Sequence, residues 1–220
     1  ENLLKDTFRK LRIQTVVNHL RIDENIVEHI KHELGHQFYS IFCQDITDDT
    51  IVITCEGMGD YSSNTVSTYT NNEFVELYAS TDNHLAKLYK YITLILGMKP
   101  DMHEYKVMGL APYANDYEIN KAYPIFKDIF KVSNLGIIFN NKPKDMYFYF
   151  KEKLQSCRFD GIAGALQKVS EEILMEWINN CIKIIGKKDI VFSGGVAQNI
   201  KAAMHISEIS DLNNIYIGPS

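Results

Sequence analysis

No apolar stretch in the 220-residue chain approaches the length of about 20 residues that a membrane-spanning helix needs. The first residues, Glu-Asn-Leu-Leu-Lys-Asp, are charged and amphipathic, unlike the apolar core of a signal peptide. We therefore expect a cytoplasmic protein with no membrane partner.

Basic residues and paired cysteines are also scarce. Lys and Arg total 23 against 28 Asp and Glu, a net charge of −5, and no basic run gives nucleic acid a surface to bind. The four cysteines lie far apart, and the absence of any C-x-x-C pair argues against a zinc ribbon or a redox dithiol. These features favour reduced thiols and no nucleic-acid partner.

Two histidines spaced for metal binding stand out in the sequence His-Glu-Leu-Gly-His, residues 32–36. On a helix, His32 and His36 share one face, where two neutral imidazoles can bind one metal ion. The five residues also fit the zinc-peptidase pattern H-E-x-x-H, in which Glu33 would be the general base. Residues 34–42 continue with helical spacing.

The segments around this motif predict a mixed α/β fold. A helix is expected at 1–12, a short strand at 26–30 and a polar turn at 45–49. Residues 50–55, 61–70 and 73–80 predict a three-stranded meander with a hairpin turn at Asn71-Asn72. Further helices are expected at 84–96, 103–110, 117–130 and 160–185, an aromatic covering segment at 147–150, and strands at 189–192 and 215–217.

Two glycine turns follow predicted strands. Gly57 and Gly59 lie between Glu56 and Asp60, where backbone N–H groups can face a phosphate with no Cβ in the way. Gly194 and Gly195 follow the strand 189–192 at the edge of the sheet where α/β proteins bind ligands, and Asn199 opens the next helix. An ordinary structural turn remains an alternative at each place.

The peptidase alternative lacks a third ligand in the expected place. A third histidine six residues beyond His36 is absent, because that position is Phe42. Glu56 has a tempting spacing, but it follows a β-branched strand instead of lying on a helix. Local structure therefore disfavours a zinc metallopeptidase.

The order of these motifs, together with the run His-Glu-Tyr-Lys-Val-Met-Gly-Leu-Ala-Pro-Tyr at 103–113, resembles the O-carbamoyltransferases of the nodulation-protein and cephem-carbamoylation type. The resemblance extends over about residues 26–217. This half of those enzymes is similar to the core protein of tRNA threonylcarbamoyladenosine synthesis, so it implies the actin/Hsp70/sugar-kinase (ribonuclease H-like) class of two-lobed ATPases. The family usually has a second histidine where this chain has Glu33, and alanine at Gly35.

The resemblance implies carbamoyl transfer from carbamoyl phosphate, through an ATP-derived carbamoyl-adenylate, to a hydroxyl of a small molecule such as a sugar, an aminoglycoside or another natural product. It implies a divalent metal on His32 and His36, with iron favoured and zinc or magnesium as alternatives. Phosphate or nucleotide contacts are expected from a set of seven residues: Gly57, Gly59, Asp60, Lys106, Gly194, Gly195 and Asn199. No general base is assigned.

The chain is expected to be a fragment, 1–220, of the carbamoyltransferase N-terminal domain, because it starts without Met and stops just after an apolar run. Residues 26–100 would belong to a first lobe and 101–220 to a second. The resemblance places a third metal ligand beyond Ser220 and the carbamoyl-adenylate chemistry in a missing C-terminal domain, so the fragment alone would be inactive. A non-catalytic ATP-binding domain is the other alternative.

Overall fold

The computed structural model describes residues 2–43 and 49–219, which form two compact units, Glu1–Lys31 and His32–Ser220. The first unit holds α1 (Asn2–Leu20) and a 3-10 turn, η1 (Glu24–Ile26), where the Asp23 carboxylate accepts the N–H of Asn25 at 2.9 Å. The helix is longer than expected from 1–12. The strand predicted at 26–30 is wrong, since alternation alone makes no strand without a neighbouring strand to pair with.

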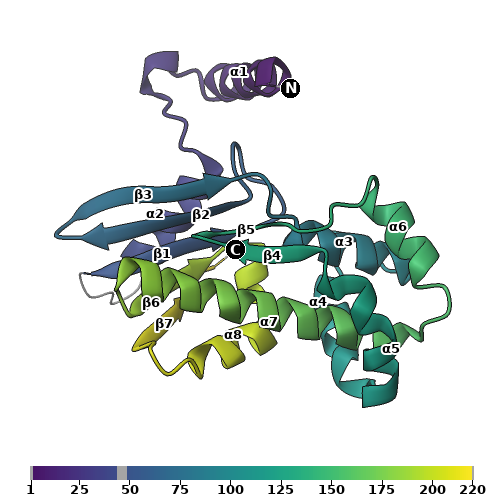
Figure 1. The fold of residues 1–220 in the computed structure, drawn as a ribbon. Coiled ribbons are helices and arrows are strands. Elements are labelled where there is room, and N and C mark those ends of the chain that lie inside the picture. Colours follow the sequence, from purple (N-terminus) through teal and green to yellow (C-terminus); the bar gives the residue numbers. More distant parts are fainter. Residues whose placement is uncertain (1, 44–48, 220) are drawn as a thin grey trace. The chain divides into compact units, whose positions relative to one another are not determined.

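The second unit is built on one mixed five-stranded sheet in the order β3-β2-β1-β6-β7 (Figure 1). The meander consists of β1 (Thr50–Cys55), β2 (Asn64–Thr70) and β3 (Glu73–Ser80), antiparallel throughout, and β6 (Asp189–Ser193) and β7 (Asn214–Ile217) extend it in parallel from β1. The predicted meander, its Asn71-Asn72 turn and the two later strands are confirmed. The polar turn predicted at 45–49 lies outside the described residues except for Asp49.

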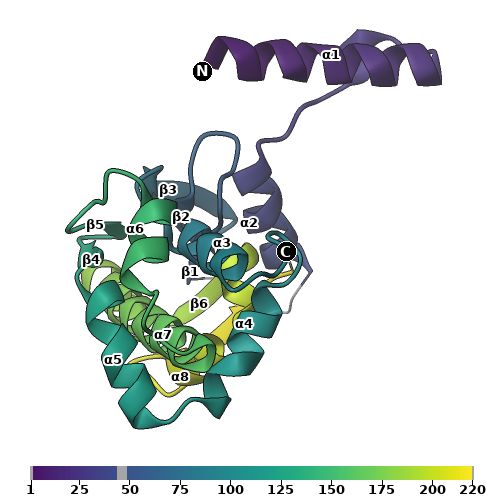
Figure 2. The same ribbon diagram turned by 90° about the vertical axis from the view of Figure 1, so that its right-hand side faces the viewer.

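Helices cover both faces of this sheet. Helix α2 (His32–Phe42) packs on one face through Ile41 against Val52 and Val191. The 27-residue α7 (Phe159–Ile185) packs on the other face with the main core (Figure 2). Gly186 ends α7 in the left-handed conformation, as the sequence indicates. The remaining helices are α3 (Leu85–Ile95), α4 (Glu104–Leu110), α5 (Asp116–Lys127), α6 (Met146–Lys153) and α8 (Ile200–Ser207), with 3-10 turns η2 (Ala111–Tyr113) and η3 (Gly195–Gln198).

These layers give the α/β architecture expected from the resemblance to actin-like ATPases, with a meander extended by parallel strands and helices on both faces. Strands from both sides of residue 100 pair in a single sheet, so the two predicted lobes share it. Their assignment to separate lobes of a larger ATPase stays a prediction. Among the described residues, no helix combines the length and apolar character needed to cross a membrane.

A second, two-stranded sheet was missed from sequence: β4 (Phe130–Ser133) and β5 (Gly136–Phe139). Its turn uses Asn134 at a φ of 50°, and Gly136 lies against the Tyr78 ring, where a Cβ would not fit. The aromatic segment at 147–150 belongs to α6, and Phe150 stacks on Phe126 with ring centroids 5.0 Å apart. Its role as a covering segment is confirmed.

His84, just before α3, makes the fold sensitive to mild acid. Its ring packs against Phe139 with centroids 4.9 Å apart, and burial, with Lys87 and Lys142 nearby, lowers its pKa. The unfolded chain therefore binds more protons between the lowered pKa and the ordinary value of 6.5, so stability is full above that window and falls as the pH drops through it.

We expect His84→Gln to reduce this fall, measured as the free energy of urea unfolding at neutral and mildly acidic pH. Lys142 helps to lower the pKa of His84 and Asp82 opposes it, so Lys142→Gln should raise this pKa toward 6.5 and make the loss of stability in acid smaller. An unchanged pH dependence in His84→Gln would contradict the assignment.

Candidate metal and nucleotide site

Helix α2 begins at His32 because the carboxylate of Asp60 accepts the His32 N–H at 3.0 Å. That bond satisfies one of the free N–H groups of the first turn, as an N-cap does. Asp60 comes from the glycine loop between β1 and β2, so the loop and the helix fix each other. Asp60 was predicted to contact phosphate, and the structure places it at this capping position.

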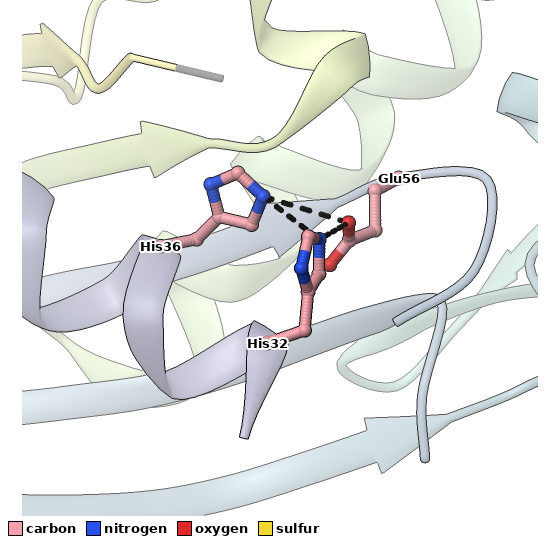
Figure 3. Close-up of side chains that lie close together, drawn as sticks. All are labelled: His32, His36 and Glu56. Atoms are coloured by element: carbon pink, nitrogen blue, oxygen red, sulfur yellow. Dashed lines mark hydrogen bonds and ion pairs between the residues drawn. The ribbon is translucent and has the colours of Figure 1, made fainter. Parts of the chain in front are cut away.

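The two histidines face each other and Glu56 (Figure 3). Their rings meet edge to face with centroids 4.7 Å apart, and the two Nε2 atoms are 3.1 Å apart. The Glu56 Oε2 lies 2.6 Å from the Nε2 of His32 and 3.5 Å from that of His36. Three potential ligand atoms therefore converge on one point, from the start of α2 and the end of β1.

Strand alternation explains why Glu56 points this way. Ile51, Ile53 and Cys55 belong to the core on the α7 side, whereas Val52 packs on the α2 side. Glu56 has the parity of Val52, and its N–H continues the β1–β2 ladder with a 2.9 Å bond to the Ser63 carbonyl. Its side chain therefore lies on the α2 face, beside the histidines.

The three residues fit a divalent metal. Two imidazole nitrogens and a carboxylate oxygen are the ligand set of many zinc and non-haem iron sites. Metal–ligand bonds of about 2.0–2.2 Å place the ligand atoms about 3 Å apart. The Nε2 atoms of His32 and His36 are separated by such a distance. The Nε2 of His32 and the Oε2 of Glu56 are closer, because they form a direct hydrogen bond. The Glu56 Oε1 is buried with no partner among the described residues, and a cation would satisfy it.

Glu56 also controls the charge of His36. Its hydrogen bond raises the pKa of His36, and this effect outweighs burial, which lowers it. The Pro219 backbone also acts to raise this pKa.

Glu33 performs a structural task. Its side chain is buried, and its Oε1 accepts the N–H of Tyr61 at 2.5 Å and the N–H and Oγ of Ser62 at 2.7 and 3.2 Å. These hydrogen bonds lower the pKa of Glu33 although burial alone would raise it. A Cβ at Gly59 would come within 2.7 Å of the Glu33 carboxyl carbon. The carboxylate thus holds the glycine loop against α2, and it is not available as the general base of a peptidase.

A cavity of about 610 Å³ lies between the two glycine turns, α3 and α4. Of the predicted contact residues, Gly57, Gly195 and Asn199 line it. Gly195 has open space where a Cβ would be, while Gly194 has a φ of +89° and lies against the Cys55 carbonyl, so it shapes the turn. Lys87 and Lys90 supply positive charge, and Lys90 is paired with Asp101 at 2.6 Å.

Lys106, Gly59 and Asp60 are not among the residues that line the cavity. Lys106 is exposed on α4 with its ammonium 5.8 Å from the centre of the Tyr105 ring, and Tyr105 itself lines the cavity. Their predicted phosphate contacts stay predictions. The structure instead brings Met108 and Glu104, from the same motif, to the cavity wall.

The cavity has a polar wall that sequence reasoning did not reveal. The Asn199 amide donates to the Tyr89 hydroxyl at 3.0 Å, and the Gln167 amide donates to the Asn199 carbonyl oxygen at 3.0 Å. Asn199 also caps α8 by accepting the Ala202 N–H. Tyr89 and Gln167 occur inside amphipathic helices, where nothing in the sequence separates them from core residues.

Comparison with known proteins identifies the family. The protein family described as "Carbamoyltransferase N-terminus" matches this chain over residues 1–220. An uncharacterized protein of Methanocaldococcus jannaschii is 28% identical over 195 residues, 86% of this chain and 37% of that protein. Nodulation protein NolNO of Sinorhizobium fredii is 26% identical over 213 residues, 90% of this chain and 30% of that protein. The chain thus spans about a third of the length of these relatives.

Among solved structures, component A of the (R)-2-hydroxyglutaryl-CoA dehydratase of Acidaminococcus fermentans aligns with 86% of this chain and 61% of that one, at 14% identity and a TM-score of 0.44. This TM-score is too low to support a conclusion about the fold, which rests on the sheet order described above. The family match covers the whole chain, including the histidine pair and both glycine turns. The chain therefore belongs to the carbamoyltransferase N-terminus family.

Proposed function

We propose that this chain is the part of an ATP-dependent O-carbamoyltransferase that passes a carbamoyl group to a hydroxyl. The convergence of His32, His36 and Glu56, next to a cavity that both glycine turns line, carries this proposal. The carbamoyl group would come from carbamoyl phosphate through a carbamoyl-adenylate formed elsewhere in the full-length protein. The acceptor would be a small hydroxylated molecule.

The proposed metal site and the cavity share consecutive residues of the chain, as expected if both belong to one reaction centre. Glu56 is a candidate ligand and Gly57 lines the cavity. A bound iron, zinc or magnesium ion would supply Lewis-acid stabilisation of charge on a carbamoyl or phosphate oxygen. The chain's own part is to hold that ion with His32, His36 and Glu56, and to present the backbone of Gly57 and Gly195 to the nucleotide.

The cavity favours a nucleotide over a peptide. It combines an open glycine backbone, two lysines on α3 and the polar wall of Tyr89 and Asn199, which suit phosphate and a purine or ribose. The peptidase alternative has its H-E-x-x-H glutamate bound to the loop N–H groups. A non-catalytic ATP-binding domain would also have the cavity. Such a domain gives no reason for the Glu56 Oε1 to be buried beside two histidines with no hydrogen-bond partner among the described residues.

Incubation of the full-length protein with ATP, carbamoyl phosphate and a panel of sugars and aminoglycosides tests the proposal. We expect a carbamoylated product, seen by mass spectrometry, that requires both ATP and carbamoyl phosphate and forms with release of pyrophosphate. Gly195→Val, which fills the open face of the turn, should abolish product formation, whereas Gly97→Asn, at a helix end outside the cavity, should not. Product formation without ATP, or peptide hydrolysis in place of transfer, would refute it.

A further inference from the structure

Gln167, on α7, holds together two residues of the cavity wall and is not itself among the residues that line the cavity. Its side chain is buried, with only 5% exposed. Its Oε1 accepts the Tyr89 hydroxyl at 2.5 Å and the Asn199 amide at 3.1 Å, and its Nε2 donates to the Asn199 Oδ1 at 3.0 Å. Two reciprocal hydrogen bonds thus join the amides of Gln167 and Asn199, and a single side chain connects α7 to both α3 and the start of α8.

The direction of these hydrogen bonds is fixed at two ends. A carboxylate can only accept, so the 2.7 Å contact with the Glu171 Oε1 turns the amide nitrogen of Gln167 toward Glu171. A backbone N–H can only donate, so the Ala202 N–H turns the Oδ1 of Asn199 toward α8. The two constraints agree, because they leave the Gln167 Oε1 to accept from Tyr89 and from the Asn199 amide.

The network leaves Asn199 with one orientation. Its amide nitrogen donates to Tyr89 and Gln167, and its Oδ1 accepts from Gln167 and Ala202. A half-turn of this amide would bring its nitrogen against the Ala202 N–H, donor against donor. Side chains that are ordered before a ligand arrives cost less conformational entropy on binding. The wall of the cavity is therefore preorganised from behind, by a residue that α7 supplies.

We propose that Gln167 is a positioning residue for the nucleotide cavity, and that Glu171 sets the direction of its amide. This inference rests on the proposed function, which places a nucleotide in this cavity. Gln167 acts on the ligand only through Tyr89 and Asn199, which line the cavity. Its loss should weaken nucleotide binding here while the rest of the wall, including Gly57 and Gly195, keeps its place.

Gln167→Leu tests the role, because leucine has a similar size and makes no hydrogen bond. The probe is AMP added to the full-length protein, and the readout is hydrogen–deuterium exchange of residues 194–202, which reports on this cavity alone. We expect AMP to protect this segment in the wild type. In Gln167→Leu the concentration for half-protection should rise about 10-fold, the loss of about one net hydrogen bond. Pyrophosphate exchange into ATP, expected in the other domain, should not change.

The control for a general loss of stability lies on the same helix. The Asn180 side-chain amide donates to the Asn134 carbonyl at 2.6 Å, and neither residue lines the cavity. Asn180→Leu also removes a hydrogen bond of α7, and its AMP affinity should equal that of the wild type. AMP affinity within 2-fold of wild type in a folded Gln167→Leu, or an equal loss in Asn180→Leu, would overturn the inference.

A pair of variants tests the direction of the network. Gln167→Glu places a second carboxylate beside Glu171 and removes the donor to Asn199, so AMP affinity should fall at least as far as in Gln167→Leu. Adding Glu171→Gln gives the new carboxylate an amide donor and should restore part of the affinity. His205 faces the other oxygen of Glu171, Oε2, at 3.6 Å and takes no part in this exchange of roles. Equal affinity in the single and double variants would contradict the role of Glu171.

Exchange in the absence of AMP separates this inference from the proposed function. Residues 194–202 should exchange faster in ligand-free Gln167→Leu than in the wild type, because Asn199 loses its partner on α7. If AMP fails to protect this segment in the wild type, the nucleotide site fails, while the ligand-free rates still decide the positioning role. Identical ligand-free rates in wild type and Gln167→Leu would show that Gln167 does not order the wall.

Discussion

Replacing His32 with alanine should lower carbamoyl transfer by the full-length protein about 10²- to 10⁴-fold, since a bound metal supplies several kcal/mol of charge stabilisation. His32 provides one of only three ligand atoms that converge among the described residues, and its loss leaves Glu56 facing His36 alone. Metal content after purification should fall in parallel. The matched control is His205→Ala, a histidine on α8 that pairs with Glu171 and Glu208 away from the site.

The same variant distinguishes catalysis from scaffolding. The carbamoyl-adenylate is expected to form in the other domain, so carbamoyl-phosphate-dependent exchange of pyrophosphate into ATP should survive in His32→Ala while transfer is lost. Full transfer activity in His32→Ala would refute the metal role of the histidine pair. Loss of both activities together with a lowered melting temperature would show that the histidine serves folding.

Replacing Glu33 with alanine should destabilise the second unit by about 3 kcal/mol or more. Three hydrogen bonds from Tyr61 and Ser62 end on one buried carboxylate oxygen, and hydrogen bonds to charged groups contribute about 1.5–3 kcal/mol each, less what water restores. For a domain of this size, we expect a melting temperature lower by about 6–12 °C. Differential scanning calorimetry measures both quantities, with Glu73→Ala on exposed β3 as the control.

Glu33→Gln gives the sharper comparison with a peptidase. An amide retains one acceptor oxygen but places a buried N–H₂ where the Glu33 Oε2 has no partner, so it should cost about 1–3 kcal/mol. The variant should keep transfer activity at temperatures where it is folded. A Glu33→Gln protein with wild-type stability and no activity would assign Glu33 to the chemistry and contradict the structural role.

Much of the fold follows from local sequence patterns. The β-branched run Thr50–Cys55, the Asn71-Asn72 turn and the apolar stripe of α7 with its terminal Gly186 each specify one element, and all three agree with the structure. The missed hairpin has strands of only four residues each, too short for period-two alternation to be visible. The strand predicted at 26–30 is wrong for a different reason: its residues alternate as in a strand, but they have no neighbouring strand to pair with.

The candidate site was predictable in part. The spacing of His32 and His36 placed both on one helical face, and the glycine turns were found from their strands. Glu56 was not predicted as the third ligand, because its direction depends on which face of β1 packs on α2. The role of Asp60 depends on a contact between segments 28 residues apart, which no local pattern contains.

The alternation along β1 limits how the chain can tolerate change. Glu56 points to the histidines only because it lies four positions, an even offset, after Val52, which packs on α2. Insertion or deletion of a single residue within 52–56 would turn the carboxylate toward the α7 core and bring Gly57 or Cys55 to face the histidines. Length variation in this family is therefore expected in the loop after Asp60 or in the β2–β3 turn, and not between these two positions.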